Sequence, residues 1–379
     1  MKQVNTDAHI KLDRRGASAG RIVLHEDAFV SMLYLERRRA ERAHNRFVLM
    51  LVDVKDAIRD GQKNRTLSKV TNALLSVTRE TDIVGWYLED HLIGVIGTEV
   101  GQAKPKMVQS RMLEKVRGAF VQALPQEKVS QISVSFHFFP EEWEGEGADH
   151  SANITLYPDL SRKQETHKFA LGVKRSMDIV GSAAALLLMS PVFAAVALAI
   201  KLSSSGPVLF KQERLGQYGR KFTVLKFRSM RTDCDARIHE EFVSQFIAGR
   251  VNGAVSDGEK PVFKIQEDPR VTAVGRFLRK TSLDEFPQFW NVLVGNMSLV
   301  GPRPPVAYEY KAYDLWHRRR VLEIKPGITG LWQVEGRSRT RFDEMVRLDL
   351  KYARGWSIWL DVKILLQTPG AVLTGDGAH

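Results

Sequence analysis

Two acidic residues that stand side by side, Asp284 and Glu285, are the strongest candidates for chemistry in the sequence. A proline follows at position 287, and basic residues precede the pair at positions 276, 279 and 280. Neighbouring carboxylates repel each other unless a cation or a substrate shares them. Mg²⁺ binds through one or two carboxylates together with substrate phosphates. The grouping therefore indicates phosphate chemistry with Mg²⁺ as the cofactor.

The same residues also fit a helix start. Ser282 and Glu285 have the Ser-x-x-Glu spacing of a capping box, in which both side chains satisfy free backbone amides. Pro287, however, lacks the amide that would bond the carbonyl of Leu283. We therefore expect an irregular helix start, whose free amides and partial positive charge attract a phosphoryl group.

Three motifs make the pattern specific. They are Ser-Leu-Asp-Glu-Phe-Pro-Gln at residues 282–288, Gly-Asn-Met-Ser-Leu-Val-Gly-Pro-Arg-Pro at 295–304, and Lys-Pro-Gly-Ile-Thr-Gly-Leu-Trp-Gln-Val at 325–334. With Asn291 between the first two, they resemble the bacterial monotopic phosphoglycosyl transferases, also called polyprenyl-phosphate sugar-phosphate transferases. The resemblance runs in unbroken order from about residue 169 to the end of the chain.

The resemblance implies a reaction. Asp284 would attack the β-phosphorus of a UDP-sugar, expel UMP and form an aspartyl phosphosugar, which polyprenyl (undecaprenyl) phosphate then attacks. Glu285 would hold the Mg²⁺ that neutralises the diphosphate. Such a step begins the assembly of an exopolysaccharide or another surface glycan. The acid pair alone would equally permit direct transfer, with both carboxylates on the metal.

The segment after residue 206 reads as a small β-hairpin. Lys226 and Arg228 alternate with apolar residues in its second strand, so their side chains share one face. That face is solvated in an ordinary sheet. In the family it lines the approach to the acids, which favours Lys226 as a substrate-binding residue.

Three arginines complete the candidate site. The family carries a phosphate-binding arginine at the position of Arg279, and a planar fork of donors suits a diphosphate. Prolines on both sides fix the backbone around Arg303, which orients one cation toward an anion or simply makes a rigid turn. The family match makes Arg337 a candidate for the nucleotide end of the donor.

A membrane segment precedes these motifs. Residues 179–200 carry no charge and as a helix would be about 33 Å long, enough to cross a bilayer. Ser190 and Pro191 interrupt the segment, and basic residues at both ends give it no preferred direction. We expect a re-entrant kinked helix at about residues 174–201, as the family implies, rather than a spanning or a buried core helix. Lys174 and Arg175 would hold a lipid phosphate or anchor the helix at the interface.

The N-terminal part reads as an α/β domain over residues 1–140. Its expected elements are helices at 26–45, 65–80 and 106–123, strands at 47–53 and 132–139, and a hairpin with strands at 83–88 and 91–97. This order is similar to a diguanylate-cyclase domain, with Arg79 and Asp82 at the place of its inhibitory site. The hairpin sequence Leu-Glu-Asp-His-Leu at 88–92 lacks the glycines and paired acids of a cyclase. The domain is then degenerate, and serves as an accessory, dimerisation or nucleotide-sensing unit.

Residues 141–167 have the acidic and polar composition of a linker, and residues 168–379 form the transferase domain. Within that domain we expect a glycine-rich mobile loop at 232–262 and two amphipathic helices after residue 339. The fold class is thus an α/β N-terminal domain followed by a mainly α monotopic membrane catalytic domain with a re-entrant kinked helix and a small β-hairpin.

Composition limits the partners. The 379 residues carry a net charge of +12, which suits nucleic acid, an anionic membrane surface or a phosphorylated substrate. Because the basic residues are interleaved with acids, we expect no nucleic acid; DNA affinity that falls steeply with salt would revive that alternative. A lone cysteine and the absence of a signal peptide lead us to expect the bulk of the chain in the cytosol. Together with the membrane segment, the family resemblance implies the cytoplasmic face of a bacterial inner membrane. A membrane-tethered nucleotide sensor, and a homodimer, remain open.

Overall fold

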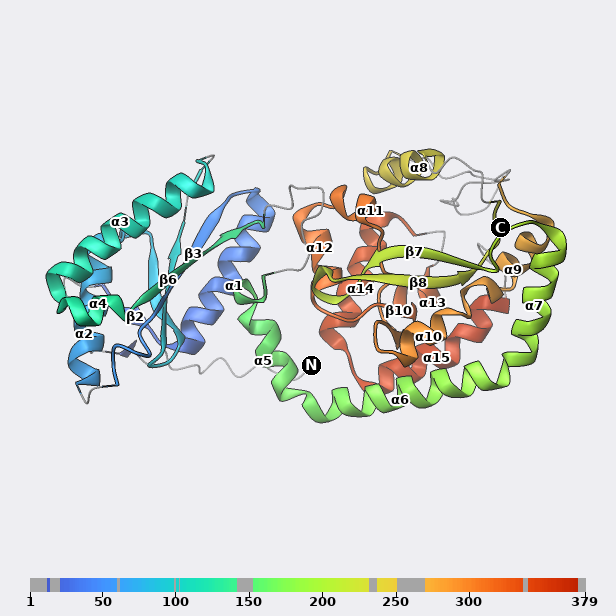
Figure 1. Cartoon of the computed structure of the whole chain (residues 1–379), viewed down its shortest axis with the longest axis horizontal. Coiled ribbons are helices and arrows are strands. Elements are labelled where there is room, and N and C mark those ends of the chain that lie inside the picture. The colour runs from blue at the N-terminus through green and yellow to red at the C-terminus, as the bar shows by residue number, and fades with distance from the viewer. Residues whose placement is uncertain are drawn as a thin grey trace. The chain divides into compact units, whose positions relative to one another are not determined.

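The computed structural model describes residues 12–13, 21–59, 62–98, 100–101, 103–141, 153–231, 237–250, 270–336 and 340–373 (Figure 1). The chain divides into two compact units. The first comprises residues 1–146 and 153–163, and the second comprises residues 147–152 and 164–379. Separate clusters of buried apolar side chains occupy each unit.

A six-stranded sheet forms the centre of the first unit, in the order β1-β2-β4-β5-β3-β6. Its strands are β1 (Leu12–Asp13), β2 (Val23–Leu24), β3 (Phe47–Asp53), β4 (Ile83–Leu88), β5 (Leu92–Gly97) and β6 (Ser133–Phe139). Neighbours pair antiparallel except β2 and β4, which run parallel. The continuous apolar run of β3 is buried on both faces, as expected for a central strand.

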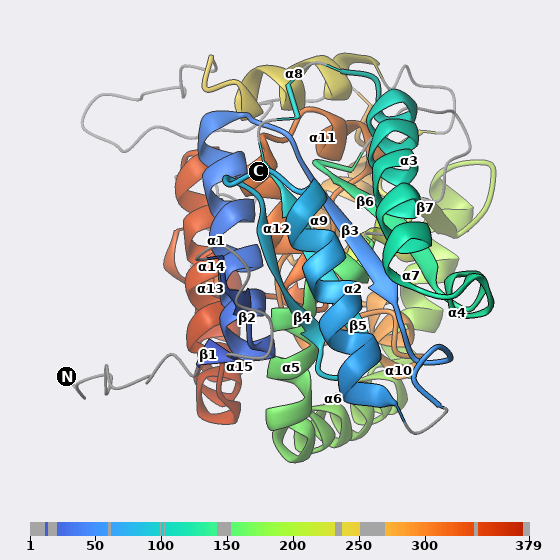
Figure 2. The ribbon, with the colours of Figure 1, turned by 90° about the vertical axis from the view of Figure 1, so that its left-hand side faces the viewer.

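Helices cover both faces of this sheet, with α1 (Glu26–Ala43) on one face and α2 (Lys63–Val77) and α3 (Pro105–Ala123) on the other (Figure 2). A short helix, α4 (Gln126–Ser130), follows α3. Phe29 of α1 sits over a glycine in β5, where an added Cβ at Gly94 would lie 2.3 Å from its ring. The predicted α/β architecture is confirmed.

The predicted linker differs from the structure. After a short 3₁₀ turn (Ile154–Leu156), α5 (Pro158–Thr166) begins inside the expected linker. Leu156 is fully buried, Asp159 pairs with Arg37, and Arg162 contacts Asp27 at 2.7 Å. Residues 153–163 therefore pack as part of the first unit, because a few apolar and charged anchors outweigh a polar average composition. Residues 142–152 of the predicted linker lie outside the described residues.

The second unit is mainly helical with a small β-hairpin, as predicted. Its elements are α6 (Lys168–Leu188), α7 (Ser190–Ser203), β7 (Leu209–Leu215), β8 (Lys221–Phe227), α8 (Arg237–Ile247), α9 (Ala273–Lys280), α10 (Gln288–Leu293), β9 (Ser298–Val300), α11 (Ala307–Lys311), α12 (Leu315–Leu322), β10 (Gly327–Thr329), α13 (Leu331–Glu335), α14 (Phe342–Gly355) and α15 (Ile358–Leu373). Strands β7 and β8 pair antiparallel, and β9 and β10 pair parallel. Helices α6 and α8 lie on opposite sides of the β7–β8 hairpin (Figure 1).

One further prediction for this unit is wrong in part, and another is confirmed. The expected mobile loop at 232–262 contains helix α8, so the loop prediction is wrong for residues 237–247; residues 232–236 and 251–262 lie outside the described residues. The two amphipathic helices expected after residue 339 are confirmed as α14 and α15.

The apolar segment forms a bent pair of helices. Within the described residues no single helix is long and apolar enough to cross a membrane, whereas α6 and α7 pass that test together and meet at 58°. The bend falls at Met189, and Pro191 occupies the first turn of α7, where its missing amide breaks no hydrogen bond. The predicted break at Ser190 and Pro191 is thus where the kink lies. Large apolar side chains are exposed along both helices, including Phe169, Val180, Leu187, Leu188, Leu198 and Leu202.

Candidate active site

The acid pair lies in an irregular turn between two helices. Ser282, in the left-handed conformation (φ 56°), ends the approach from α9, and Leu283–Glu285 form a single 3₁₀ turn before α10. The Ser282 side chain makes no capping hydrogen bond, so the capping box is wrong. The irregular helix start is confirmed, because Pro287 interrupts the helix between the acids and α10.

Lys226 reaches the acid pair from strand β8. Its Nζ donates to Oε1 of Glu285 at 2.6 Å. The buried amide of Asn291, on α10, fixes the strand beside the acids: its Oδ1 accepts from the Leu225 amide at 3.0 Å, and its Nδ2 donates to the Thr223 carbonyl at 2.7 Å. Lys226 thus lies beside the acid pair, as the sequence predicts, while its role in substrate binding stays a prediction.

Arg279 reaches the acids from helix α9. Thr272 caps the helix by accepting from the Gly275 amide at 2.9 Å. An added Cβ at Gly275 would lie 1.9 Å from the carbonyl oxygen of Ser229, so only glycine lets α9 pack directly on the end of β8. This packing brings Arg279, in the last turn, close enough to Asp284 to act on its pKa.

Two further arginines, Arg303 and Arg214, lie near enough to Glu285 for their charges to act on its pKa. Arg303 is exposed in the Gly-Pro-Arg-Pro-Pro segment after β9. Arg214, at the end of β7, is buried and donates to the Pro304 carbonyl at 2.6 Å and to Gln212 at 2.7 Å. Burial lowers the pKa of Arg214 to about 10, with the neighbouring charge of Arg303 as the next cause.

The two carboxyl groups differ in charge state. Burial and then the adjacent charge of Glu285 raise the pKa of Asp284 to about 6, against the opposing effects of Lys226 and Arg279. Burial would also raise the pKa of Glu285, but the ion pair with Lys226 and the charges of Arg303 and Arg214 hold it below its usual value. The site therefore presents one firmly ionised carboxylate beside a second that is ionised at neutral pH and titrates just below it.

These groups suit a divalent cation that arrives with phosphates. Among the described residues no set of three or more histidine, cysteine or acidic side chains could hold a metal. Asp284 and Glu285 supply hard oxygen donors, and burial followed by the negative charge of Glu285 raises the pKa of Asp284, so two adjacent carboxylates share a poorly solvated place. Mg²⁺ relieves such charge with one or two carboxylates and substrate phosphates.

The basic pair at the start of α6 lies elsewhere in the second unit. Lys174 is buried, and its Nζ donates to Asp361 at 2.7 Å, to the Val300 carbonyl at 3.0 Å and to Tyr352 at 3.3 Å. All three ammonium protons are therefore used, and the assignment of Lys174 to a lipid phosphate is corrected to a structural ion pair.

Arg175 is likewise committed to the protein. Its two terminal nitrogens donate to the carbonyls of Val292 and Leu293 at 2.6 and 2.7 Å, which caps the end of α10. Asp178, one turn along α6, accepts from the amide of Leu299 at 2.8 Å and from Ser298 at 3.0 Å. The start of α6 thus fastens the bent helix pair to α10, which follows the acid pair, and to β9, which precedes the Arg303 segment.

The structure brings three predicted basic residues close to the acid pair, namely Lys226, Arg279 and Arg303. Arg337 lies outside the described residues. Arg214 was not singled out from the sequence. Phe210, Gln212 and Arg214 alternate along β7 and therefore share one face of the hairpin. Because Phe210 pairs with Lys226, Lys226 lies on that face too, and this pairing cannot be seen in the sequence.

Comparison with known proteins finds relatives of the second unit. Residues 169–375 match the family model described as bacterial sugar transferase. The chain is 44% identical over 224 residues to the galactosyl transferase CpsE of Streptococcus agalactiae, and 43% identical over 210 residues to the undecaprenyl-phosphate galactose phosphotransferase of Salmonella typhimurium. These matches cover 59% and 55% of this chain but only 47% and 42% of those relatives, so the chain spans less than half of their length.

A third relative is shorter. The exopolysaccharide production protein ExoY of Rhizobium meliloti is 39% identical over 206 residues, which are 54% of this chain and 88% of that protein. For the first unit, a DGC protein from Thermotoga maritima aligns over 32% of this chain and 84% of its own length, with 20% identity and a TM-score of 0.27. We draw no conclusion from a likeness at that score, and the diguanylate-cyclase resemblance stays a prediction.

Proposed function

We propose that this chain, which belongs to the bacterial sugar transferase family, transfers a sugar phosphate from a UDP-sugar to undecaprenyl phosphate and releases UMP. The observation that carries the proposal is the acid pair itself: buried Asp284 lies beside the Glu285–Lys226 ion pair and within the field of three arginines. A membrane-tethered nucleotide sensor is not favoured, because it leaves this cluster without a role.

The reaction proceeds in two displacements. A carboxylate oxygen of Asp284 attacks the β-phosphorus of the donor, and the bond from that phosphorus to the bridging oxygen breaks, so UMP leaves with the bonding electrons. A phosphate oxygen of the lipid then attacks the same phosphorus and expels the Asp284 carboxylate. The product is a polyprenyl-diphosphate sugar, and the enzyme is regenerated. No general base is needed, since both nucleophiles are already ionised at neutral pH.

The chain's own residues stabilise the charge that develops on the phosphoryl oxygens. Lys226 keeps Glu285 ionised and in place, and Arg279 faces Asp284. Arg303 and Arg214 add positive charge on the Glu285 side. Such preorganised cations contribute most where water is excluded. Mg²⁺, held by Glu285, would neutralise the donor diphosphate.

The bent helix pair supports a position at a membrane surface. A re-entrant pair leaves both ends on the cytoplasmic face, where the donor nucleotide is made available to the site. The 58° bend and the exposed apolar side chains of α6 and α7 favour this topology. Reporters placed before Lys174 and after Lys201 should both be cytoplasmic; opposite locations would exclude re-entry. Replacing Pro191 by Leu should straighten the pair and favour a spanning helix.

The covalent step is tested by mass. Wild-type protein incubated with UDP-sugar and no lipid should release one UMP and gain one sugar phosphate on the peptide that carries Asp284. Asp284→Asn should form no adduct, and Glu285→Gln should form it slowly and only at high Mg²⁺. An unmodified peptide, with UMP released only when lipid is added, would show direct transfer and exclude the aspartyl intermediate.

A further inference from the structure

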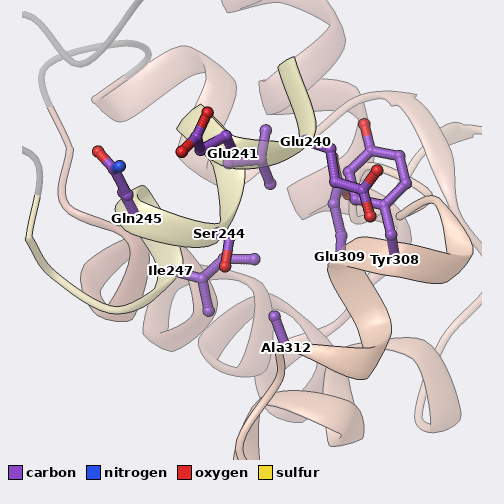
Figure 3. Close-up of a pocket in the computed structure, with 9 residues that line it drawn as sticks. Glu240, Glu241, Ser244, Gln245, Ile247, Tyr308, Glu309 and Ala312 are labelled. Carbon is purple, nitrogen blue, oxygen red and sulfur yellow. The ribbon is translucent and has the colours of Figure 1, made fainter. Parts of the chain in front are cut away.

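A surface pocket of about 410 Å³ lies between helices α8 and α11 (Figure 3). Polar side chains from both helices line it: Glu240, Glu241, Ser244 and Gln245 from α8, and Tyr308 and Glu309 from α11. Val243, Ile247 and Ala312 add apolar wall. The pocket is large enough for a monosaccharide, and neither the sequence nor the mechanism above assigns it a role.

The pocket adjoins the catalytic cations. Helix α11 begins at Ala307, directly after the segment in which Arg303 lies and in which Pro304 accepts from Arg214. The charges of Arg303, Glu309, Glu285 and Tyr308 all act on the Arg214 guanidinium. Arg214 is therefore near enough to both Glu285 of the acid pair and Tyr308 and Glu309 of the pocket wall for their charges to act on its pKa.

The lining has a definite chemistry. Carboxylates accept hydrogen bonds from hydroxyl groups, and a tyrosine, a serine and an amide both donate and accept. Burial and then the negative charge of Glu309 raise the pKa of Tyr308, so its hydroxyl keeps its proton. Among the side chains that the structure describes, the lining includes no lysine, arginine or histidine. Such a wall binds a neutral polyol and repels a carboxylate.

We propose that this pocket holds the sugar ring of the donor and selects neutral hexoses over uronic acids. The inference rests on the proposed function and names its substrate class. With the diphosphate at Arg214, Arg303 and the acid pair, a sugar on the β-phosphate extends toward α11. Glu240 and Glu241 then accept from its hydroxyls, and Tyr308 contacts it from the opposite wall.

The test compares matched pairs of donors that differ only at the sugar C6 group, UDP-glucose with UDP-glucuronate and UDP-galactose with UDP-galacturonate. Wild-type protein should release UMP from the neutral member of at least one pair with a kcat/KM about tenfold or more above that of its uronate. Glu240→Gln/Glu241→Gln should narrow this ratio about tenfold, because the repulsive charges are gone. Tyr308→Phe should raise KM for the neutral donor about 3–10-fold.

Two controls locate the effect at the sugar. The inhibition constant of UDP, which has no sugar, should stay within about twofold of the wild-type value in all these variants. Glu165→Gln/Glu344→Gln removes the same charge from exposed positions outside the pocket and should leave the donor ratio unchanged.

The outcomes separate two failures. An unchanged donor ratio in Glu240→Gln/Glu241→Gln, or a parallel loss of UDP inhibition, would overturn the sugar subsite while the transferase proposal stands. Wild-type protein that releases no UMP from any UDP-sugar would overturn the proposed function itself.

Discussion

Two lysine–carboxylate pairs in the second unit have almost the same geometry and different surroundings. Lys226 and Glu285 are 2.6 Å apart, with side chains 22% and 35% exposed. Lys174 and Asp361 are 2.7 Å apart, with side chains 9% and 3% exposed. The sequence offered both lysines as substrate-binding residues, so the difference between the pairs lies in access and in their further partners.

The sealed pair has no capacity left for a substrate. Asp361 also accepts from Tyr352 at 2.5 Å and from Trp356 at 3.1 Å, and Lys174 donates to the Val300 carbonyl. The open pair instead adjoins a second carboxylate, Asp284, whose pKa burial and the charge of Glu285 raise despite the opposing charges of Lys226 and Arg279. An ion pair whose donors and acceptors are all used stabilises the fold, whereas one that leaves charge beside an accessible group supports chemistry.

The largest expected effect is on stability at the sealed pair. Lys174→Met leaves the Asp361 carboxylate buried without its cation and should lower the free energy of unfolding by about 3–5 kcal/mol. Thermal unfolding in detergent micelles measures this. Lys174→Met/Asp361→Leu removes both charges and should recover most of the loss. A stable single variant that loses only lipid-dependent turnover would restore Lys174 as a ligand of the lipid phosphate.

At the open pair the effect should fall on turnover. Lys226→Met should lower kcat/KM for UMP release about 100–1000-fold, since a preorganised cation at the transition state is lost. The free energy of unfolding should change by less than about 1 kcal/mol, as for other solvent-accessible pairs.

Strand β8 supplies a matched control for this variant. Lys221 lies at the other end of the same strand and pairs with Glu213 at 3.0 Å, with side chains 38% and 58% exposed. Lys221→Met should leave turnover unchanged. Equal losses in Lys221→Met and Lys226→Met would show that the strand, and not the cation beside Glu285, matters.

The sequence predicts contacts between residues that are close along the chain, and it misses contacts between residues that are far apart. Asp284 and Glu285 are adjacent, and Arg279 precedes them by little more than one helical turn, so a linear motif brings them together. Most elements of the first unit were equally legible, because alternating and continuous apolar runs fix strands and helices locally.

Other features depend on contacts that no local pattern encodes. Lys174 meets Asp361 across 187 residues, and Arg214 meets Pro304 across 90. A basic residue beside an apolar segment has the same appearance whether its partner is a lipid phosphate or a buried aspartate. The burial of Leu156 within the expected linker was missed for the same reason, because its segment meets distant parts of the chain: the carbonyl of the adjacent Thr155 accepts from the Tyr87 hydroxyl at 3.0 Å, across 68 residues.

The next effect in size concerns the protonation of Asp284 in the open pair. Its pKa of about 6 lies above the usual value, and only the ionised carboxylate attacks phosphorus. Turnover should therefore be full well above pH 6 and fall about tenfold per unit below it. Glu285→Gln removes the repelling charge, so the pKa of Asp284 should drop and the residual activity should persist to lower pH. An unshifted profile would assign the titration to another group.

The smallest effect should come from Tyr352 in the sealed pair. Tyr352→Phe removes a single hydroxyl proton, for which Asp361 at 2.5 Å and the Val300 carbonyl at 3.1 Å are both within reach, while Lys174 still donates to both acceptors. The free energy of unfolding should fall by about 1 kcal/mol. Because β9 ends at Val300, three residues before Arg303, kcat/KM would also drop if the sealed pair positions that arginine. Adding Arg303→Ala decides this point: if Tyr352→Phe lowers turnover equally in both backgrounds, it acts independently of Arg303, and if its effect vanishes there, the sealed pair acts on chemistry through the loop.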